Sequence, residues 1–506
     1  MKNKWMTACA ALVLVLSACH KESDKVYNYA FKDELLFAGA RQSFGEMFKI
    51  VWNGLNTNYA IWDYEKEKGL DWDAVYEEYY PKFCALDSLD TVADADLQAL
   101  AEEAFGSLHD GHLVINMDNW RTGGKVRVDP GTLRVKAERG EEMEATMYFK
   151  SNLTYYAGIP GELLEYKSAN YTSPLNYYLA WVGQQLAILS EKEPLTEEEL
   201  ALEAALMGFM NELKAAWSTN QAELINRVIY KYKDLGVPGL DYVDEQLLPY
   251  RMSMNYALFS GNIAYLSFNS FSLTPFLAPE EVGVSWTNSP RSTKEYVERI
   301  RQVWNDWFYA IQRLHKEGKL GGVIIDVRSN GGGFMNDYKF VLGALVPSGG
   351  LHVLDARYKR GTGRYDYSPL VPMKFETYPY EHETITEPIV VLANCNSVSM
   401  AEVTSMGTKV LDNAVLMGTR TFGGLCALTG NEEYNYNYSG HVGVEGETPV
   451  FCYTPSLATF SLDGHILEGV GVTPDIEVAF DKETWADGAG PDSQIDRALE
   501  YIRTRK

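Results

Sequence analysis

A serine stands between an apolar stretch and a run that can form a helix. Residues 389–393 (IVVLA) have the composition of a buried strand, and Ser399 follows six positions later. A helix that begins there would present free backbone N–H groups in its first turn, and its dipole favours negative charge at that end. The N–H of Met400, with a second donor, would stabilise an oxyanion formed when Ser399 attacks a carbonyl. The alternative is a plain helix cap, because Ser399 and Glu402 have the spacing of a capping box.

A glycine-rich turn is the expected source of the second donor. Residues 326–333 (DVRSNGGG) begin at the end of another apolar stretch, residues 323–327. Glycine allows the backbone to approach a ligand closely, so the N–H of Gly332 or Gly333 is a candidate oxyanion donor. Such turns are common between strands and helices, and this one indicates a site only together with the serine.

Four segments occur in a fixed order along the second half of the chain. They are residues 326–333 (DVRSNGGG), 397–402 (SVSMAE), 418–424 (GTRTFGG) and 468–475 (EGVGVTPD). Together they resemble the core signatures of C-terminal-processing and tricorn-type serine peptidases, with likeness over about residues 40–115 and 256–480. The resemblance implies a ClpP- and crotonase-like α/β core with a mixed, partly parallel sheet. It also implies peptide hydrolysis through an acyl-enzyme on Ser399, without a metal or organic cofactor.

The expected general base separates two branches of that family. In the processing branch a lysine in the second glycine-rich motif is the base, and Gly424 occupies that position here. In the tricorn branch a histidine is the base and a glutamate orients it, which places these roles on His112 and Glu468. An imidazole suits the role because its ordinary pKa lies near neutrality and a carboxylate can fix its tautomer. The serine that precedes the tricorn histidine is replaced by Gly111.

Other assignments of these residues stay open. His112 follows Asp110 and Gly111, so it is also typical of a turn, and Glu468 is also compatible with a plain loop carboxylate. His109 and His465 lie close to these two positions in sequence and are rival bases.

The surrounding elements divide the chain into regions. We expect an N-terminal helical domain at 41–125, a mainly helical middle region at 126–250 without a normal PDZ domain, the peptidase core at 256–480 and a C-terminal helix at 481–506. Alternating strands and helices from residue 256 onward indicate the α/β core. A strand-like stretch is expected at about 125–135, and helices are expected at 197–216, 297–314 and 399–411.

The N-terminus has the features of a bacterial lipoprotein signal. Two lysines precede an apolar run, and residues 16–19 (LSAC) resemble a lipobox. We expect residues 1–18 to be removed, Cys19 to carry lipid, and residues 19–40 to form a tether on an outer-membrane protein that faces the periplasm or the cell surface. The four cysteines left have no zinc spacing, and free thiols are preferred to disulfides.

Composition limits the class of partner. Apolar residues make up 46% of the chain and its net charge is −24. This describes a folded acidic protein, so we expect a peptide or protein substrate and no nucleic acid. Two further hypotheses are an inactive peptide-binding module on the same fold and a glycan-binding surface lipoprotein.

Overall fold

The computed structural model describes residues 37, 39–147, 153–170, 182–183, 185–192, 194–218, 227–229, 231–233, 252–287, 291–361, 363–427 and 441–505. The expected signal peptide and Cys19 lie outside these residues. No helix within the described part of the chain is long and apolar enough to cross a membrane.

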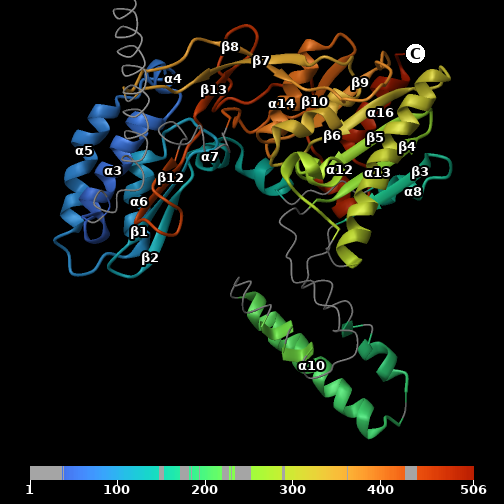
Figure 1. Ribbon diagram of the computed structural model, residues 1–506, viewed down its shortest axis with the longest axis horizontal. Coiled ribbons are helices and arrows are strands. Elements are labelled where there is room, and N and C mark those ends of the chain that lie inside the picture. The colour runs from blue at the N-terminus through green and yellow to red at the C-terminus, as the bar shows by residue number, and fades with distance from the viewer. Residues whose placement is uncertain are drawn as a thin grey trace, which may run out of the picture.

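A group of helices forms the N-terminal region, at the left of Figure 1. They are α3 (Phe44–Asn58), α4 (Trp62–Glu67), α5 (Trp72–Leu86) and α6 (Asp94–Phe105), preceded by the 3-10 turn η1 (Ala40–Gln42). Helix α3 begins where Ser43 accepts the N–H of Glu46. Its apolar face, including Phe44 and Val51, is fully buried against the other helices. The expected N-terminal helical domain is confirmed.

A four-stranded sheet lies beneath these helices and joins two distant parts of the chain. Its order is β11 (His441–Val442), β12 (Val450–Tyr453), β1 (Val114–Asn119) and β2 (Gly124–Val128). Strand β1 pairs antiparallel with both β2 and β12. The predicted peptidase core therefore contributes two strands to the N-terminal region.

The strand expected at 125–135 is wrong in its second half. Strand β2 ends at Val128, and α7 (Pro130–Thr146) begins directly afterwards. Asp129 accepts the N–H of Thr132 as the helix cap, and Pro130 occupies the first turn, where its missing N–H costs nothing.

A seven-stranded sheet forms the peptidase core. In order, it contains β14 (Ile476–Glu477), β10 (Ala414–Gly418), β9 (Ile389–Ala393), β6 (Gly322–Asp326), β5 (Ile263–Phe268), β4 (Met254–Phe259) and β3 (Leu163–Ala169). The strands from β14 to β5 are parallel to their neighbours, whereas β5, β4 and β3 pair antiparallel. The expected mixed, partly parallel α/β core is confirmed, although β3 belongs to it from outside the predicted 256–480 range.

Helices cover both faces of this sheet, because its central strands are apolar on both sides (Figure 1). Ala264 and Leu266 face the cluster that contains α13 (Arg291–Lys316) and α14 (Met400–Gly407). Tyr265 and Ile324 face the cluster that contains α16 (Ser493–Arg503). Smaller helical elements complete the core: α8 (Thr154–Ala157), α12 (Thr274–Leu277), η2 (Pro279–Val282), η3 (Met335–Phe340), η4 (Leu342–Ala344), η5 (Thr408–Val410), α15 (Lys482–Trp485) and η6 (Ala486–Gly488).

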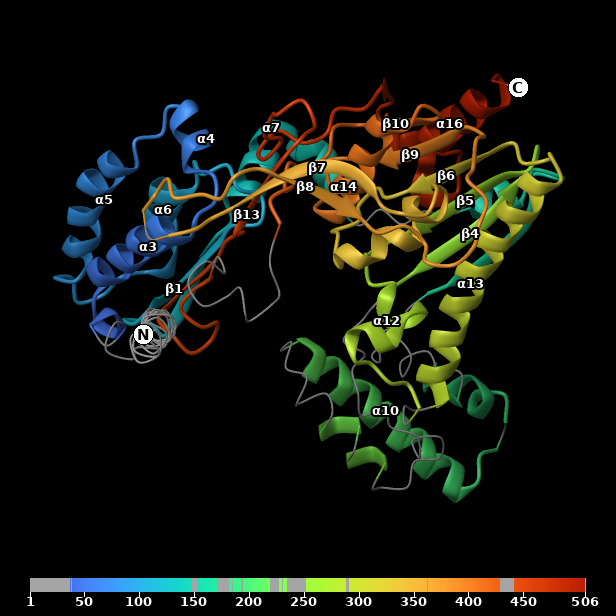
Figure 2. The same cartoon turned by 45° about the horizontal axis from the view of Figure 1, so that its top comes forward.

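A third sheet connects the two regions. Strands β7 (Leu351–Tyr358), β8 (Val371–Phe375) and β13 (Leu457–Phe460) pair in the order β13-β7-β8. Figure 2 shows β7 and β8 running as a long arch from the core toward the N-terminal helices.

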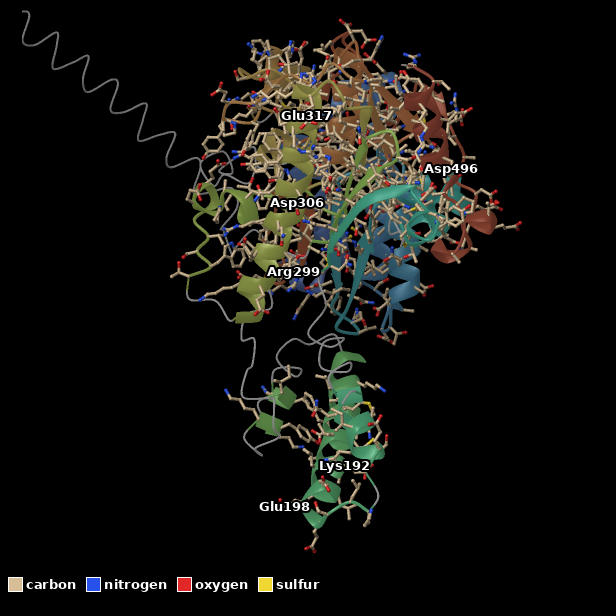
Figure 3. All side chains as sticks on the ribbon, turned by 90° about the vertical axis from the view of Figure 1, so that its right-hand side faces the viewer. Lys192, Glu198, Arg299, Asp306, Glu317 and Asp496 are labelled. Atoms are coloured by element: carbon tan, nitrogen blue, oxygen red, sulfur yellow. The ribbon has the colours of Figure 1, made fainter. Side chains whose placement is uncertain are left out.

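The middle region contains α10 (Glu197–Ser218). This helix shares a separate apolar cluster that includes Phe209 and Tyr232. In Figure 3, Lys192 and Glu198 lie at the end of this unit, far from the labelled residues of α13. The expected helix at 197–216 agrees with α10, whereas much of the rest of 126–250 lies outside the described residues.

Candidate active site

Ser399 lies between β9 and α14 in a strained backbone conformation. Its φ is 58° and its ψ is −117°, whereas an ordinary helix-capping residue adopts the extended region. Positive φ is uncommon for a residue with a side chain and costs free energy that the surroundings must supply. A sharp strand-to-helix turn of this kind exposes a nucleophilic serine. Ser399 is partly exposed, whereas the next residue, Met400, is buried.

Glu402 ties the serine to a second loop. Its fully buried carboxylate accepts the N–H of Ser399 at 3.1 Å, as half of the expected capping box. It also accepts the hydroxyl of Thr421 and the N–H groups of Gly423 and Gly424. Burial raises the pKa of Glu402 to about 7, although the donors from Thr421, Gly423 and Gly424 oppose the shift. Glu402 therefore fixes the nucleophile's turn against residues 421–424.

The glycine-rich turn lies directly against Ser399. A Cβ added to Gly332 would lie 2.6 Å from the Cβ of Ser399 and 2.9 Å from the nitrogen of Met400. The N–H of Gly332, however, donates to Oδ1 of Asn330 at 2.9 Å, so it is not free for an oxyanion in this structure. The structure records no hydrogen bond for the N–H of Met400 or of Gly333 among the described residues. These two groups remain the available donors of the predicted set.

His112 lies two residues before β1, and its ring is partly enclosed. Its backbone N–H donates to Oδ1 of Asp110 at 2.8 Å, which fixes the turn before the strand. The ring nitrogen Nδ1 is shielded from solvent and has no hydrogen-bond partner among the described residues. Burial lowers the pKa of His112 to about 4, and the nearby charge of Asp129 opposes this shift. The imidazole is therefore neutral at neutral pH, as a general base must be.

Glu468 contacts the backbone of the histidine's loop and not its ring. One carboxylate oxygen accepts the N–H of Gly111, and the other accepts the N–H groups of Leu425 and Cys426 at 2.6 Å each. Burial raises the pKa of Glu468 despite these three donors. Among the described side chains, no hydrogen bond joins Glu468 to His112 or His112 to Ser399. The sequence predicted that Glu468 orients the ring of His112, whereas the structure places this carboxylate on the backbone of the loop that carries His112.

Gly424 lies between the two halves of the site. Its carbonyl oxygen accepts the N–H of Ser399 at 3.1 Å. A Cβ on Gly111 would lie 2.6 Å from the Cα of Gly424, so the loop that carries His112 packs on the loop that holds Ser399. This short distance explains why residue 111 is a glycine, because the Cβ of a serine there would clash with the backbone of Gly424. Gly424 itself stands at the position expected for a lysine in the processing branch.

The two rival histidines point elsewhere. Nδ1 of His109 is 2.8 Å from the buried carboxylate of Glu65, and a Cβ on Gly469 would lie 3.1 Å from its Cδ2. His465 is mostly exposed, and its ring is 3.9 Å from Asp463. The structure joins neither ring to Ser399 among the described residues.

Helix α7 braces the loops around the nucleophile, which the sequence did not predict. Arg139 donates to the carbonyl groups of Arg420 and Thr421. Glu142 accepts the hydroxyl of Thr419, and Thr146 accepts an amide N–H of Asn396 at 2.9 Å. The only local signal was the Asp-Pro pair at 129–130, which is typical of a helix start.

Arg328 braces the core from below the glycine-rich turn. It is buried and bonds Asp326, Asp492 and Gln494, so its loop is tied to the start of α16. This supports a structural and not a chemical role for Asp326 and Arg328.

Two buried residues beside Glu468 carry atoms of the kind that bind metal ions. Asp110, Cys426 and Glu468 have ligand atoms within 4.8 Å of one another. The carboxylate of Glu468 is already used by three backbone donors, and we assign no metal to this cluster. The described cysteines Cys84, Cys395, Cys426 and Cys452 are free thiols, as preferred.

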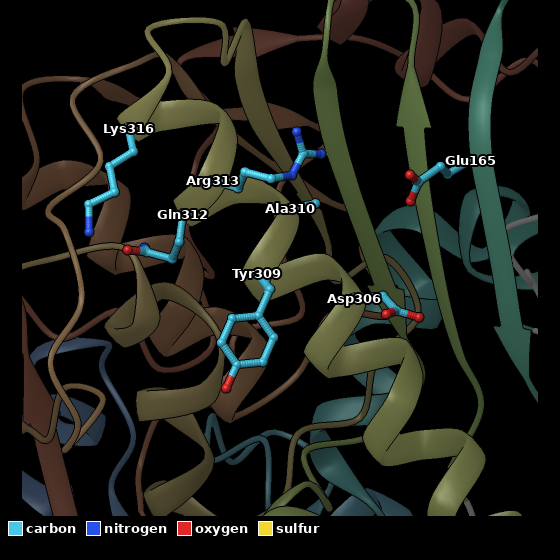
Figure 4. Close-up of a pocket in the computed structure, with 7 residues that line it drawn as sticks. All are labelled: Glu165, Asp306, Tyr309, Ala310, Gln312, Arg313 and Lys316. Atoms are coloured by element: carbon cyan, nitrogen blue, oxygen red, sulfur yellow. The ribbon is translucent and has the colours of Figure 1, made fainter.

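Two surface pockets lie away from Ser399. Figure 4 shows one of about 420 Å³ between α13 and β3, lined by Glu165, Asp306, Tyr309 and neighbouring residues. Another, of about 390 Å³, is lined by residues of α4 together with His465 and Val470. Neither contains the nucleophile or His112.

Comparison with known proteins places this geometry in a family. Residues 262–478 match the model of peptidase family S41. Over these residues the chain is similar to the core of an S41 peptidase. The S41 core holds Ser399, the glycine-rich turn and Glu468, while His112 comes from the helical region that precedes it.

The S41 core is similar to several described proteins. The tricorn protease of Thermoplasma volcanium is 26% identical over 186 residues, which cover 37% of this chain and 15% of that protein. The carboxy-terminal processing protease CtpA of Bacillus subtilis is 32% identical over 114 residues, or 22% of each chain. The chain thus spans less than a quarter of these relatives' length. A solved candidate peptidase from Parabacteroides merdae aligns over 91% of this chain and 96% of its own, with a TM-score of 0.47 and 17% identity.

Proposed function

We propose that this protein is a serine endopeptidase that hydrolyses peptides or protein tails through an acyl-enzyme. The observation that carries the proposal is the strained turn at Ser399, with Gly332 packed on it and the free N–H of Met400 beside it. The S41 core and the processing and tricorn proteases that it resembles support the same reaction class.

The reaction follows from the groups around the serine. Oγ of Ser399 attacks the carbonyl carbon of the scissile bond, and His112 accepts the hydroxyl proton. The N–H of Met400, with Gly333 as the second donor, stabilises the oxyanion. The protonated His112 then gives its proton to the leaving amine, and water hydrolyses the acyl-enzyme. Glu468 contributes by fixing the Gly111 peptide before His112, and no metal or organic cofactor takes part.

One observation favours a second candidate function. His112 is not hydrogen-bonded to Ser399 in this structure, and no lysine replaces it at position 424. A peptide- or glycan-binding surface lipoprotein on the same fold, without hydrolysis, would also have this arrangement. Catalytic contacts in ligand-free enzymes are often long and tighten with substrate, which is why the peptidase is preferred.

A fluorophosphonate probe separates these two functions. The probe reacts only with an activated serine, so the wild-type protein should be labelled and a tryptic peptide containing Ser399 should carry the adduct. Ser399→Ala should lose the label and at least about 10³-fold of the peptidase activity while unfolding at the same temperature. An unlabelled but folded wild-type protein would favour the binding function.

The site of action is also a proposal. The lipobox-like residues 16–19 support a lipid anchor on Cys19 in the outer membrane, facing the periplasm or the cell surface. Metabolic labelling with a radioactive fatty acid should mark the wild-type protein and not Cys19→Ala, which would be recovered without membranes.

A further inference from the structure

His112 lacks a partner for the ring nitrogen that a catalytic histidine normally uses for orientation. In a serine–histidine–carboxylate arrangement, Nδ1 donates to the carboxylate and Nε2 faces the nucleophile. Nδ1 of His112 is buried and has no hydrogen bond among the described residues. A buried polar atom without a partner requires an explanation, because its desolvation is not offset.

The carboxylate expected from the family resemblance does not fill this place. The oxygens of Glu468 accept three backbone N–H groups, from Gly111, Leu425 and Cys426. Turning this carboxylate toward the imidazole would leave buried donors unpaired, at a cost of about 1–3 kcal/mol each. Glu468 therefore holds the loops, and another acid must face the ring.

The pairing of β1 with β2 brings one other carboxylate to the correct face. Ile115 pairs with Val128, so the same register places Asp129 opposite Val114. Burial alternates along β1, with Ile115 inside and Val114 partly exposed on the other face. His112 is two residues before Val114, and the buried Leu113 between them keeps the alternation. His112 and Asp129 are thus diagonal neighbours on one face, a separation that two side chains can bridge.

A close backbone approach and an electrostatic effect support this placement. A Cβ on Gly131 would lie 2.8 Å from the Cα of Gly111, so the start of α7 passes directly over the peptide that precedes His112. The negative charge of Asp129 also acts on the imidazole and raises its pKa against the effect of burial.

Asp129 has a free capacity to accept a hydrogen bond. Oδ1 accepts the N–H of Thr132 at 3.1 Å as the helix cap. Oδ2 makes a long ion pair of 3.5 Å with Arg127, whose side chain is mostly exposed. Asp110 accepts two backbone N–H groups of this turn through Oδ1, and its buried Oδ2 has no hydrogen-bond partner among the described residues. The charge that acts on the imidazole is that of Asp129. Arg134 donates from Nη1 to the carbonyl of His109.

We propose that Asp129 is the positioning residue of His112, accepting a hydrogen bond from Nδ1–H so that Nε2 faces Ser399. This inference rests on the proposed peptidase function and assigns the orienting role to the strand-to-helix junction before α7. Asp129 stabilises the Nδ1–H tautomer before the reaction and the imidazolium during it.

The test uses Asp129→Asn, because asparagine caps a helix as well as aspartate does and only the charge is lost. The matched control is Asp118→Asn, on the same face of β1 but paired with Lys125 at the far end of the strand. Histidine labelled with ¹⁵N in the full chain reports the tautomer at pH 7, and His112→Gln assigns the signal. The wild type and Asp118→Asn should show Nδ1–H, and Asp129→Asn should shift toward Nε2–H.

The rate of fluorophosphonate labelling is the second readout. It should fall at least about tenfold in Asp129→Asn, since one pKa unit of imidazolium stabilisation corresponds to a factor of ten. An unchanged tautomer and rate in Asp129→Asn would overturn the role of Asp129 and leave the peptidase proposal standing. An unlabelled wild type would overturn the peptidase proposal, while the tautomer comparison would still decide whether Asp129 holds His112.

Discussion

Replacing Gly332 by alanine should inactivate the nucleophile without unfolding the protein. The new Cβ would lie 2.6 Å from the Cβ of Ser399, 2.8 Å from the oxygen of Val398 and 2.9 Å from the nitrogen of Met400. All three atoms belong to the nucleophile's turn, so the turn must move to make room. The φ of Gly332 is +84°, a conformation that costs an L-residue about 1–2 kcal/mol.

The two effects differ in size and can be measured apart. Loss of 1–2 kcal/mol should lower the unfolding temperature by a few degrees, at about 2–4 °C per kcal/mol for a domain of this size. Displacing the N–H of Met400 from the oxyanion should slow the reaction by about 10²- to 10³-fold, as for other single oxyanion donors. The assay is the second-order rate of fluorophosphonate labelling, with calorimetric unfolding of the same samples.

Gly331→Ala is the matched control. No heavy atom lies within 4 Å of a Cβ at this position, and Gly331 is not among the glycines with positive φ. Its labelling rate should stay close to wild type, with stability within about 0.5 kcal/mol. A wild-type rate in Gly332→Ala, or an equal loss in Gly331→Ala, would refute the crowding of the nucleophile's turn as the cause.

Four other outcomes are expected. Gly424→Lys should not restore peptide hydrolysis to a His112→Ala protein. A Cβ at position 424 already lies 3.1 Å from the side chain of Val398, and the lysine amine would be protonated at neutral pH. Efficient rescue would reveal a latent lysine base. The lowered pKa of His112, about 4, keeps the base neutral, so kcat/KM should stay level from pH 8 to about 5 and fall as the pH drops through 4. For the same reason His112 should contribute a loss of about 3 kcal/mol in folding stability between pH 6.5 and 4, since only the unfolded histidine accepts a proton there. The difference between the wild type and His112→Gln in denaturant titrations measures this contribution apart from that of Glu402, whose raised pKa acts in the opposite direction. Arg328→Met should cost about 3–5 kcal/mol in urea unfolding, because it leaves Asp326 and Asp492 buried without their cation, and a loss below 1 kcal/mol would contradict that role.

The core strands could be predicted because each is apolar on both faces. Residues 389–393 were expected as a strand and are β9 with these bounds. Helix α14 ends at Gly407 and not at 411, because η5 (Thr408–Val410) tightens the last turn. The pairing of β12 with β1 could not be predicted, since no local pattern records a partner more than 300 residues away.

The site could be predicted only where its features depend on residues that are close in sequence. Ser399 follows a strand and begins a helix, and both features are local. The contacts of Glu468 and the face of His112 depend on how distant segments pack, which the family resemblance supplied only as residue roles. The start of α7 at Asp129 and Pro130 was a local signal that the expected strand at 125–135 overlooked.

The sequence separation between paired segments also determines how much of the chain must be synthesised before the loop that carries His112 is held in place. Gly111 and Glu468 are 357 residues apart, and β1 gains its second neighbour only from residues 450–453. A chain that emerges from its N-terminus therefore presents His112 long before the strand and carboxylate that hold its loop exist. A fragment that stops before residue 450 lacks both, and one that stops between residues 453 and 468 lacks the carboxylate. The proposed peptidase activity would therefore be absent from nascent and prematurely terminated chains and would arise only after the residues up to Glu468 have been synthesised and folded.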